Sequence, residues 1–449
     1  MRASIRGSET SADEPWPLRR PPPTKRGEFL LDSLLSKGQS GVRVRHLGGN
    51  RAGELRITRF LRSRHVTPRE MFATARARTL GLVKDRHVLV IQDTTSLRDD
   101  GQAKSLQLHP AIAVDAAEGA LLGLLSAQFL RRDQLVKTHC NKRALADKES
   151  RRWIEATQEA QALREAGAAR VTVITDREGD IYEEFALRPP DVDVLIRVHH
   201  DRKLAEGTSL YAATDNTTEL GRETITLPAA PGRPARSATL ALRATPVRIK
   251  RPKRNRASWA AALPPAVELW LVDAREVDPP SDATPIHWRL LTTHAVTTLA
   301  EGCRITGFYR RRWVIEQVFR VMKTKGFDIE AVRIEAVRPF ENLAAAILIA
   351  AIQVQQMVHD RDGTAARPLT DVFEVDEQPA LEAVCATLEG KTARQKNPHP
   401  KGSLAYGTWV CARLGGWTGY YGKPGPIVIL QGHLRFKEML AGWKIARDV

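Results

Sequence analysis

The stretch VTVITDREGDIYEEFALRPPDVDVLIRV, residues 171–198, places two apolar runs on either side of a polar segment. Residues 171–175 and 192–198 are rich in Val and Ile, which predicts two strands, and the residues between them predict a short helix near 178–187. A strand, a helix and a second strand at this spacing form a βαβ unit whose two strands run parallel. The sequence therefore predicts an α/β fold.

The flanking segments extend this pattern. The run HVLVIQ at 87–92 predicts a strand, two more strands are expected within 110–115 and 120–130, and helix formers predict a helix over 147–167. Residues 200–295 alternate strand-like runs with Pro- and Gly-rich turns, which indicates a mostly β insertion.

Helical patterns bracket the chain. Residues 1–27 are rich in Pro, Arg and Ser and predict a disordered basic arm, and residues 28–83 predict helices. Helices return at 298–325 and 338–360, and the region 361–449 is also expected to be helical. One helix start is well marked: Thr67 is the expected N-cap, Pro68 the first helical residue, and Glu70 completes a capping box.

The net charge of the protein indicates what kind of molecule it binds. The chain of 449 residues carries a formal net charge of +17, and a chain this basic usually meets a polyanion, of which nucleic acid is the first candidate. The longest apolar run, residues 343–352, is shorter than the ~18 residues that a membrane span needs, so we expect a buried helix and no membrane. The four cysteines lack metal-site spacing, which fits a reducing cytoplasm and argues against structural zinc.

A basic run at 248–256, RIKRPKRNR, overlaps the end of a predicted strand within the β insertion. Such a run is either a solvated face or a contact for DNA phosphates, and the sequence leaves both readings open.

Two carboxylates follow predicted strands. Asp93 comes after the run at 87–92, and Asp176 comes after the strand at 171–175. Side chains at the carboxyl edge of an α/β sheet commonly form its functional site. Either Asp could instead belong to a turn or cap a helix, because Asp is common at both positions.

A third carboxylate, Glu316, lies within the basic stretch YRRRWVIEQVFRVMK at 309–323. On a continuous helix of about 100° per residue, Tyr309, Arg312, Arg320 and Lys323 share its face. The opposite face carries Val314, Ile315, Val318, Phe319 and Val321.

The polar face of this helix has two interpretations. Surface ion pairs spaced i,i+4 explain the charges but leave Tyr309 and the nearby Trp313 unexplained. A carboxylate that binds a metal ion, beside cations that bind phosphate, explains the whole face. Phosphoryl transfer with two metal ions uses a few such carboxylates to hold cations ~3.5–4 Å apart.

These motifs together resemble a known family. The spacing of Tyr309, Arg312, Glu316 and Lys323 matches the Y-R-E-K signature of bacterial cut-and-paste insertion-sequence transposases. Those DDE enzymes include the Tn-five-type and IS-four-type transposases. IQDTTSL resembles the motif around their first catalytic Asp, TDREGDIYE resembles the second, and the likeness covers roughly residues 47–443 in the family's order.

The resemblance implies an RNase H-like catalytic domain over 84–360, interrupted by the β insertion. Asp93, Asp176 and Glu316 would be its catalytic triad and would hold two Mg²⁺ ions, for which Mn²⁺ would substitute. The helical N-terminal region would bind DNA ends, and the helical C-terminal region would pair two subunits.

The same resemblance implies a set of DNA contacts. Arg312 and Lys323 would hold phosphates near the cut, as would Arg320 on the same face, and Tyr309 would brace the backbone. Trp288 lies where the family stacks a flipped base, although a Trp buried by its strand is the alternative. Arg197 matches a basic residue near the family's active site.

The expected activity is cut-and-paste transposition in the bacterial cytoplasm, at the nucleoid. Hydrolysis at the 3′ side of the transposon end would be followed by hairpin formation and strand transfer, with double-stranded terminal inverted repeats and target DNA as partners of a homodimer. The Pro- and Arg-rich start departs from the family pattern. The alternatives are a truncated or decayed copy that acts only as a DNA-binding protein or inhibitor, and a stand-alone metal-dependent nuclease.

Overall fold

The computed structural model describes residues 23–38, 42–98, 105–131, 150–227, 234–252, 262–281, 283–323, 326–420 and 422–447. Most of the expected N-terminal arm, residues 1–22, and part of the basic run, residues 253–256, lie outside these ranges. The remainder of the arm belongs to the first helix, which begins at Pro23.

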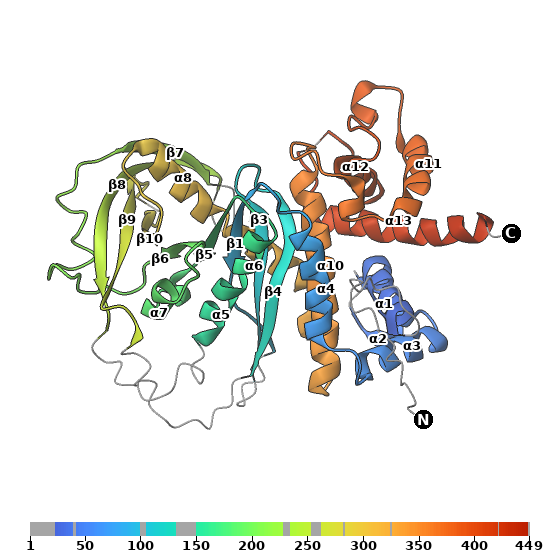
Figure 1. Ribbon diagram of the computed structural model, residues 1–449. Coiled ribbons are helices and arrows are strands. Elements are labelled where there is room, and N and C mark those ends of the chain that lie inside the picture. The colour runs from blue at the N-terminus through green and yellow to red at the C-terminus, as the bar shows by residue number, and fades with distance from the viewer. Residues whose placement is uncertain are drawn as a thin grey trace, which may run out of the picture.

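A ten-stranded mixed sheet runs through the protein in the order β2-β3-β1-β5-β6-β10-β9-β8-β7, with β4 paired to β3 (Figure 1). The strands are β1 (His87–Gln92), β2 (Thr95–Arg98), β3 (Leu106–Asp115), β4 (Leu121–Arg131), β5 (Arg170–Thr175), β6 (Asp193–Arg197), β7 (Gly221–Leu227), β8 (Arg236–Lys250), β9 (Ala266–Val277) and β10 (His287–Thr292).

The first part of this sheet confirms the predicted α/β pattern. β5 and β6 pair in parallel, as the βαβ unit predicts, and β1 is the parallel neighbour of β5 on its other side. β3 runs antiparallel to both β1 and β4. The order β4-β3-β1-β5-β6, in which β3 alone opposes the rest, is compatible with an RNase H-like domain. β1 and β5 are almost wholly buried, which explains their continuous apolar runs.

The strands of the β insertion continue the same sheet. β10 pairs antiparallel with β6, and β9, β8 and β7 follow it in antiparallel order. This continuity places β10 beside the end of β6, with Leu290 opposite Arg197. The insertion therefore supplies a strand next to the edge at which the βαβ unit ends.

Helices cover the sheet and form a second layer beside β4. The helices are α1 (Pro23–Lys37), α2 (Val44–Gly48), α3 (Arg51–Arg62), α4 (Pro68–Leu80), α5 (Arg151–Glu159), α6 (Gln161–Glu165), α7 (Tyr182–Ala186), α8 (Leu299–Arg310), α9 (Trp313–Met322), α10 (Val337–Asp360), α11 (Gln378–Leu388), α12 (Leu404–Leu414) and α13 (Pro426–Arg447). In Figure 1, α4 and α10 stand beside β4, and the helices of both chain ends gather on the other side of α10.

α10 is the centre of the helical layer. It contacts β4, α9 and α1 as well as the C-terminal helices α12 and α13. Its length and hydropathy would suit a membrane span, but 78% of its most apolar window is buried inside the protein. The prediction of a buried helix at 343–352 is confirmed, because these residues pack almost entirely out of solvent as in the core helix of a soluble protein.

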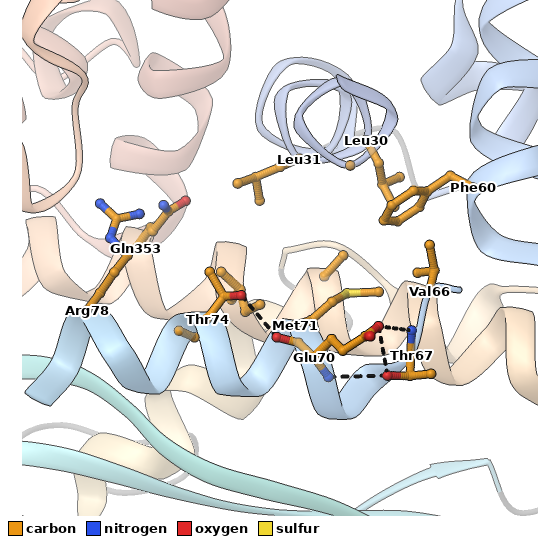
Figure 2. Close-up of a pocket in the computed structure, with 14 residues that line it drawn as sticks. Leu30, Leu31, Phe60, Val66, Thr67, Glu70, Met71, Thr74, Arg78 and Gln353 are labelled. Atoms are coloured by element: carbon orange, nitrogen blue, oxygen red, sulfur yellow. Dashed lines mark hydrogen bonds between the residues drawn. The ribbon is translucent and has the colours of Figure 1, made fainter. Parts of the chain in front are cut away.

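The N-terminal helices dock on α4 and α10 across a small apolar pocket (Figure 2). Leu30, Phe60 and Met71 are among its lining residues. The predicted helix start is confirmed at the pocket's edge, where Thr67 and Glu70 form both hydrogen bonds of a capping box and Pro68 begins α4.

The helix expected over 298–325 is broken. α8 ends at Arg310 and α9 begins at Trp313, so Tyr309 and Glu316 lie on different helices and the assumption of one continuous helix is wrong. The break has a packing reason, because α8 contacts β7, β8 and β9 whereas α9 contacts β1 and α10. The apolar face of α9 is nevertheless as expected, with Ile315, Val318, Phe319 and Val321 buried and Val314 half-buried.

Candidate active site

Two of the acids lie where two parallel strands end. Asp93 directly follows β1 and Asp176 directly follows β5, and these strands are neighbours in the sheet. The chain turns sharply after Asp176 through a short 3₁₀ turn at Arg177–Gly179. A Cβ at Gly179 would lie 2.3 Å from the hydroxyl oxygen of Thr175, so this turn depends on glycine.

The two residues between α8 and α9, Arg311 and Arg312, point in different directions. Arg311 donates to the main-chain oxygens of Asp115, at 2.7 Å, and Ala117, at 3.0 Å, and so anchors the break on the turn after β3. Arg312 points instead toward the ends of β1 and β5. The local arginine-rich sequence thus serves both as an anchor and as a charged group of the site.

The guanidinium of Arg312 contacts all three acids. Its Nη1 lies 3.0 Å from Asp93 Oδ2, and its Nη2 lies 3.7 Å from Asp176 Oδ2 and 2.5 Å from Glu316 Oε1. The Arg312 side chain is only 12% exposed. Three carboxylates that come from three separate segments of the chain therefore surround one positive charge.

The electrostatics of this cluster favour a cation at its centre. Burial, helped by the charges of Glu316 and Asp176, raises the pKa of Asp93 to about 6, although the hydrogen bond from the Thr94 amide and the charge of Arg312 oppose the shift. Burial works against the charged form of Arg312, but the three acids and Tyr309 raise its pKa overall. The acids are costly to ionise together unless positive charge compensates them.

Three of the expected DNA-contacting residues adjoin this cluster. The Tyr309 hydroxyl donates to Asp176 Oδ1 at 3.1 Å and accepts from Arg197 Nη1 at 3.3 Å. The Trp288 ring packs edge-on against the Tyr309 ring, with 5.5 Å between centroids. Burial, followed by the charge of Asp176, raises the pKa of Tyr309 to about 12, so its hydroxyl stays protonated and can donate.

Two other expected residues lie apart from the cluster. Lys323 directly follows α9, and its Nζ pairs with Glu330 at 3.0 Å. Arg320 is exposed, and no ion pair joins it to an acid within the described ranges. Tyr309, Arg312 and Glu316 still lie on one side, because Arg312 pairs with Glu316 and both Arg312 and Tyr309 contact Asp176.

The described residues contain no group of three or more His, Cys, Asp or Glu side chains already arranged around a metal position. The position between Asp93, Asp176 and Glu316 is filled by the Arg312 guanidinium. Carboxylate oxygens are the ligands that Mg²⁺ prefers, and the cluster already binds a cationic group. The three side chains are thus of the donor type that Mg²⁺ prefers, and in this arrangement they bind the guanidinium instead.

A polar chain behind Asp93 was not anticipated from the sequence. It comprises Thr94, His109, Gln92 and Glu184, all connected by hydrogen bonds, and all but Thr94 are almost fully buried. Burial raises the pKa of Glu184 to about 7, while hydrogen bonds from Thr157 and Gln92 oppose the shift. A sign of this network in the sequence is Gln92, a polar residue at the end of the mostly apolar strand β1.

Residues 133–352 match the family model described as a transposase DDE domain. The matched range contains Asp176, Arg312 and Glu316 and begins after Asp93. This match supports a DDE transposase, an enzyme that acts on DNA, and such enzymes generally use divalent metal ions.

Proposed function

We propose that the protein is a cut-and-paste DNA transposase whose Asp93, Asp176 and Glu316 form the catalytic triad. One observation carries the proposal: carboxylates from three separate segments converge on the guanidinium of Arg312. An ordinary ion pair needs one acid beside a largely buried cation such as Arg312, whereas phosphoryl transfer with two metal ions needs several carboxylate ligands in one place.

The three carboxylates would hold two Mg²⁺ ions, with Mn²⁺ as a substitute. The bound ions supply an activated water and stabilise the leaving oxygen of the cut strand. The partial burial of these acids strengthens each charge interaction among them relative to bulk water.

The neighbouring residues would position the DNA. Once released from the acids, Arg312 can bind a phosphate next to the cut through two parallel hydrogen bonds. Tyr309 and Arg197, already joined by a hydrogen bond, would brace the same backbone. Trp288 beside Tyr309 would stack a displaced base, while Arg320 and Lys323 would contact phosphates farther along α9.

The proposed reaction begins with water attack at the phosphodiester on the 3′ side of the transposon end. The released 3′-hydroxyl then attacks a phosphodiester of the opposite strand, which forms a hairpin and expels the flanking DNA with a 3′-hydroxyl. A second water reopens the hairpin, and the regenerated 3′-hydroxyl attacks a phosphodiester of the target DNA and displaces a target 3′-hydroxyl. Two subunits would act on paired ends, with the C-terminal region 361–449 between them. This more specific assignment, to transposases with the Y-R-E-K signature, rests on the sequence motifs.

A basic pocket in the N-terminal region supports DNA binding there. Arg43, Arg45, His46 and Arg51 line it, together with one acid, Glu54. Arg43 and Arg45 are exposed at the start of α2, where a phosphate could approach them. We propose that this pocket holds the backbone of a DNA end.

Replacing Arg43 and Arg45 together with Gln should lower the salt dependence of DNA binding. Each lost phosphate contact reduces the slope of log affinity against log salt by about 0.9, so the double variant should lose about two units. Fluorescence anisotropy at several salt concentrations measures the slope. The matched control replaces the exposed Lys391 and Arg394, which changes the same net charge at the C-terminal helices. Equal slopes for the two variants would remove the pocket from the DNA path.

The function is tested with the full chain, Mg²⁺, DNA that carries the flanking ends of its own gene, and a separate target plasmid. We expect hairpin-ended cuts, joining to the plasmid, and complexes of two subunits with two ends in mass photometry. EDTA should abolish all products. Cutting without joining would indicate a stand-alone nuclease, and binding without cutting would indicate a DNA-binding remnant.

A further inference from the structure

The polar chain behind Asp93 has one direction of hydrogen bonding. The Gln92 Nε2 lies 3.0 Å from Thr157 Oγ1 and 3.3 Å from both Glu184 Oε1 and the Trp153 carbonyl oxygen, so the amide must donate on that side. Its oxygen therefore faces His109 Nε2, at 3.0 Å, and accepts from it.

The hydrogen-bond donors and acceptors at the Thr94 end of this polar network follow in the same way. Because His109 Nε2 carries the proton of the neutral ring, Nδ1 has to accept, and the Thr94 hydroxyl at 2.9 Å is its donor. Burial, then the charge of Arg152, lowers the pKa of His109 to about 3, in keeping with a neutral ring. The Thr94 oxygen accepts from Arg152 Nε at 3.1 Å.

This chain ends at the first acid. The main-chain N–H of Thr94 donates to Asp93 Oδ1 at 2.7 Å, and the other carboxylate oxygen faces Arg312. The Thr94 side chain, held by His109 and Arg152, thus restrains the peptide group that orients the Asp93 carboxylate. Trp153 packs edge-on against the His109 ring, with 4.6 Å between centroids, and limits its rotation.

Arg152 also reaches the loop of the second acid. Its Nη2 pairs with Glu178 at 2.9 Å, within the turn that follows Asp176. The Arg152 side chain is 9% exposed, whereas the Glu178 side chain is 70% exposed. One buried guanidinium on α5 therefore connects the neighbour of Asp93 to the loop that begins with Asp176.

We propose that Thr94, His109 and Arg152 are positioning residues that set the Asp93 carboxylate, and its distance from the Asp176 loop, for metal binding. A purely structural network would only join α5 to the sheet. This network instead terminates on the amide that holds Asp93 and on the turn after Asp176. The inference rests on the proposed function, since it assigns metal binding to these acids.

Thr94→Val tests the proposal, because it keeps the main-chain N–H and the side-chain shape but removes the hydroxyl. The loss of groups that orient metal ligands commonly weakens metal affinity by about 10- to 100-fold. We expect the dissociation constant for Mn²⁺, measured by calorimetry on the full chain without DNA, to rise by about tenfold. Thr94→Ser should restore it to within about twofold, since the hydroxyl returns.

Thr172 offers a matched control on β5. It is fully buried, and its hydroxyl lies 2.9 Å from His87 Nε2 and 2.8 Å from His294 Nε2. Thr172→Val removes an equivalent hydroxyl from a histidine network that does not include Asp93. It should lower the melting temperature about as much as Thr94→Val and leave Mn²⁺ affinity unchanged.

The outcomes separate the inference from the proposed function. Equal Mn²⁺ affinity in the parent and Thr94→Val, or equal weakening in both Val variants, would overturn the positioning role alone. An absence of Mn²⁺ binding by the parent would overturn the proposed metal site as well. If Thr94→Val does not fold, Arg152→Lys replaces it, since it keeps the charge but lacks Nε, and an unchanged affinity would equally refute the proposal.

Discussion

Replacing Glu316 with Gln should reduce the rate of DNA cleavage by at least about a thousandfold, while DNA affinity stays within about threefold. Glu316 lies on α9 with its carboxylate against Arg312, within the group of acids proposed to hold metal. An amide keeps the shape but removes the negative charge, and a thousandfold loss corresponds to about 4 kcal/mol of transition-state stabilisation.

Single-turnover cleavage of labelled DNA ends in Mg²⁺ measures this effect, and anisotropy measures binding. Glu335→Gln is the matched control, because Glu335 is an exposed acid just before α10 and should be dispensable. Cleavage that survives Glu316→Gln would contradict the assignment of Glu316. Equal loss of cleavage and of DNA binding would point instead to a damaged fold.

Arg312→Ala should destabilise the metal-free protein by about 3 kcal/mol, because it leaves three partly buried carboxylates without their common partner. The same variant should gain much more stability from Mg²⁺ than the parent does. In the parent a divalent ion has to displace the guanidinium, whereas in the variant it enters a site whose negative charge is uncompensated.

Thermal unfolding in EDTA and in increasing Mg²⁺ concentrations measures both effects. Arg320→Ala serves as the control, since Arg320 is exposed on the same helix and should change neither quantity. Identical melting of Arg312→Ala and the parent in EDTA would show that the ion pairs contribute little. A Mg²⁺ response unchanged by the variant would mean that metal and Arg312 do not share one position.

Parts of the site could be read directly from local patterns. Asp93 and Asp176 each follow a largely apolar strand that is buried beyond its first residue, and parallel strands bring such positions to one sheet edge. The apolar face of α9 likewise follows from its spacing. These features depend on residues close in the chain, which is why pattern analysis finds them.

Other features depend on contacts between distant segments. The break before Trp313 arises because α8 must cover the β7–β9 strands while α9 packs on β1 and α10, and no local signal specifies both partners. The central position of Arg312 depends on Asp93 and Asp176, which the folded sheet brings to it from distant segments. The connection between Thr94, His109 and Glu184 spans three elements and required the assembled sheet.

By itself, the sequence determined the α/β class, the parallel β5–β6 pair, the acids at the strand ends and the strongly basic character that favours DNA. The apolar runs of the strands, the residues that follow them and the net charge are local or additive properties of the sequence. They can therefore be recognised without a structure. Only the tertiary structure decided which cation lies between the three acids, and which buried residues hold Asp93 in place. Those arrangements come from the packing of α5, α8 and α9 against one continuous sheet. Contacts between segments far apart in the chain produce no local pattern in the sequence, so they could not be predicted from it.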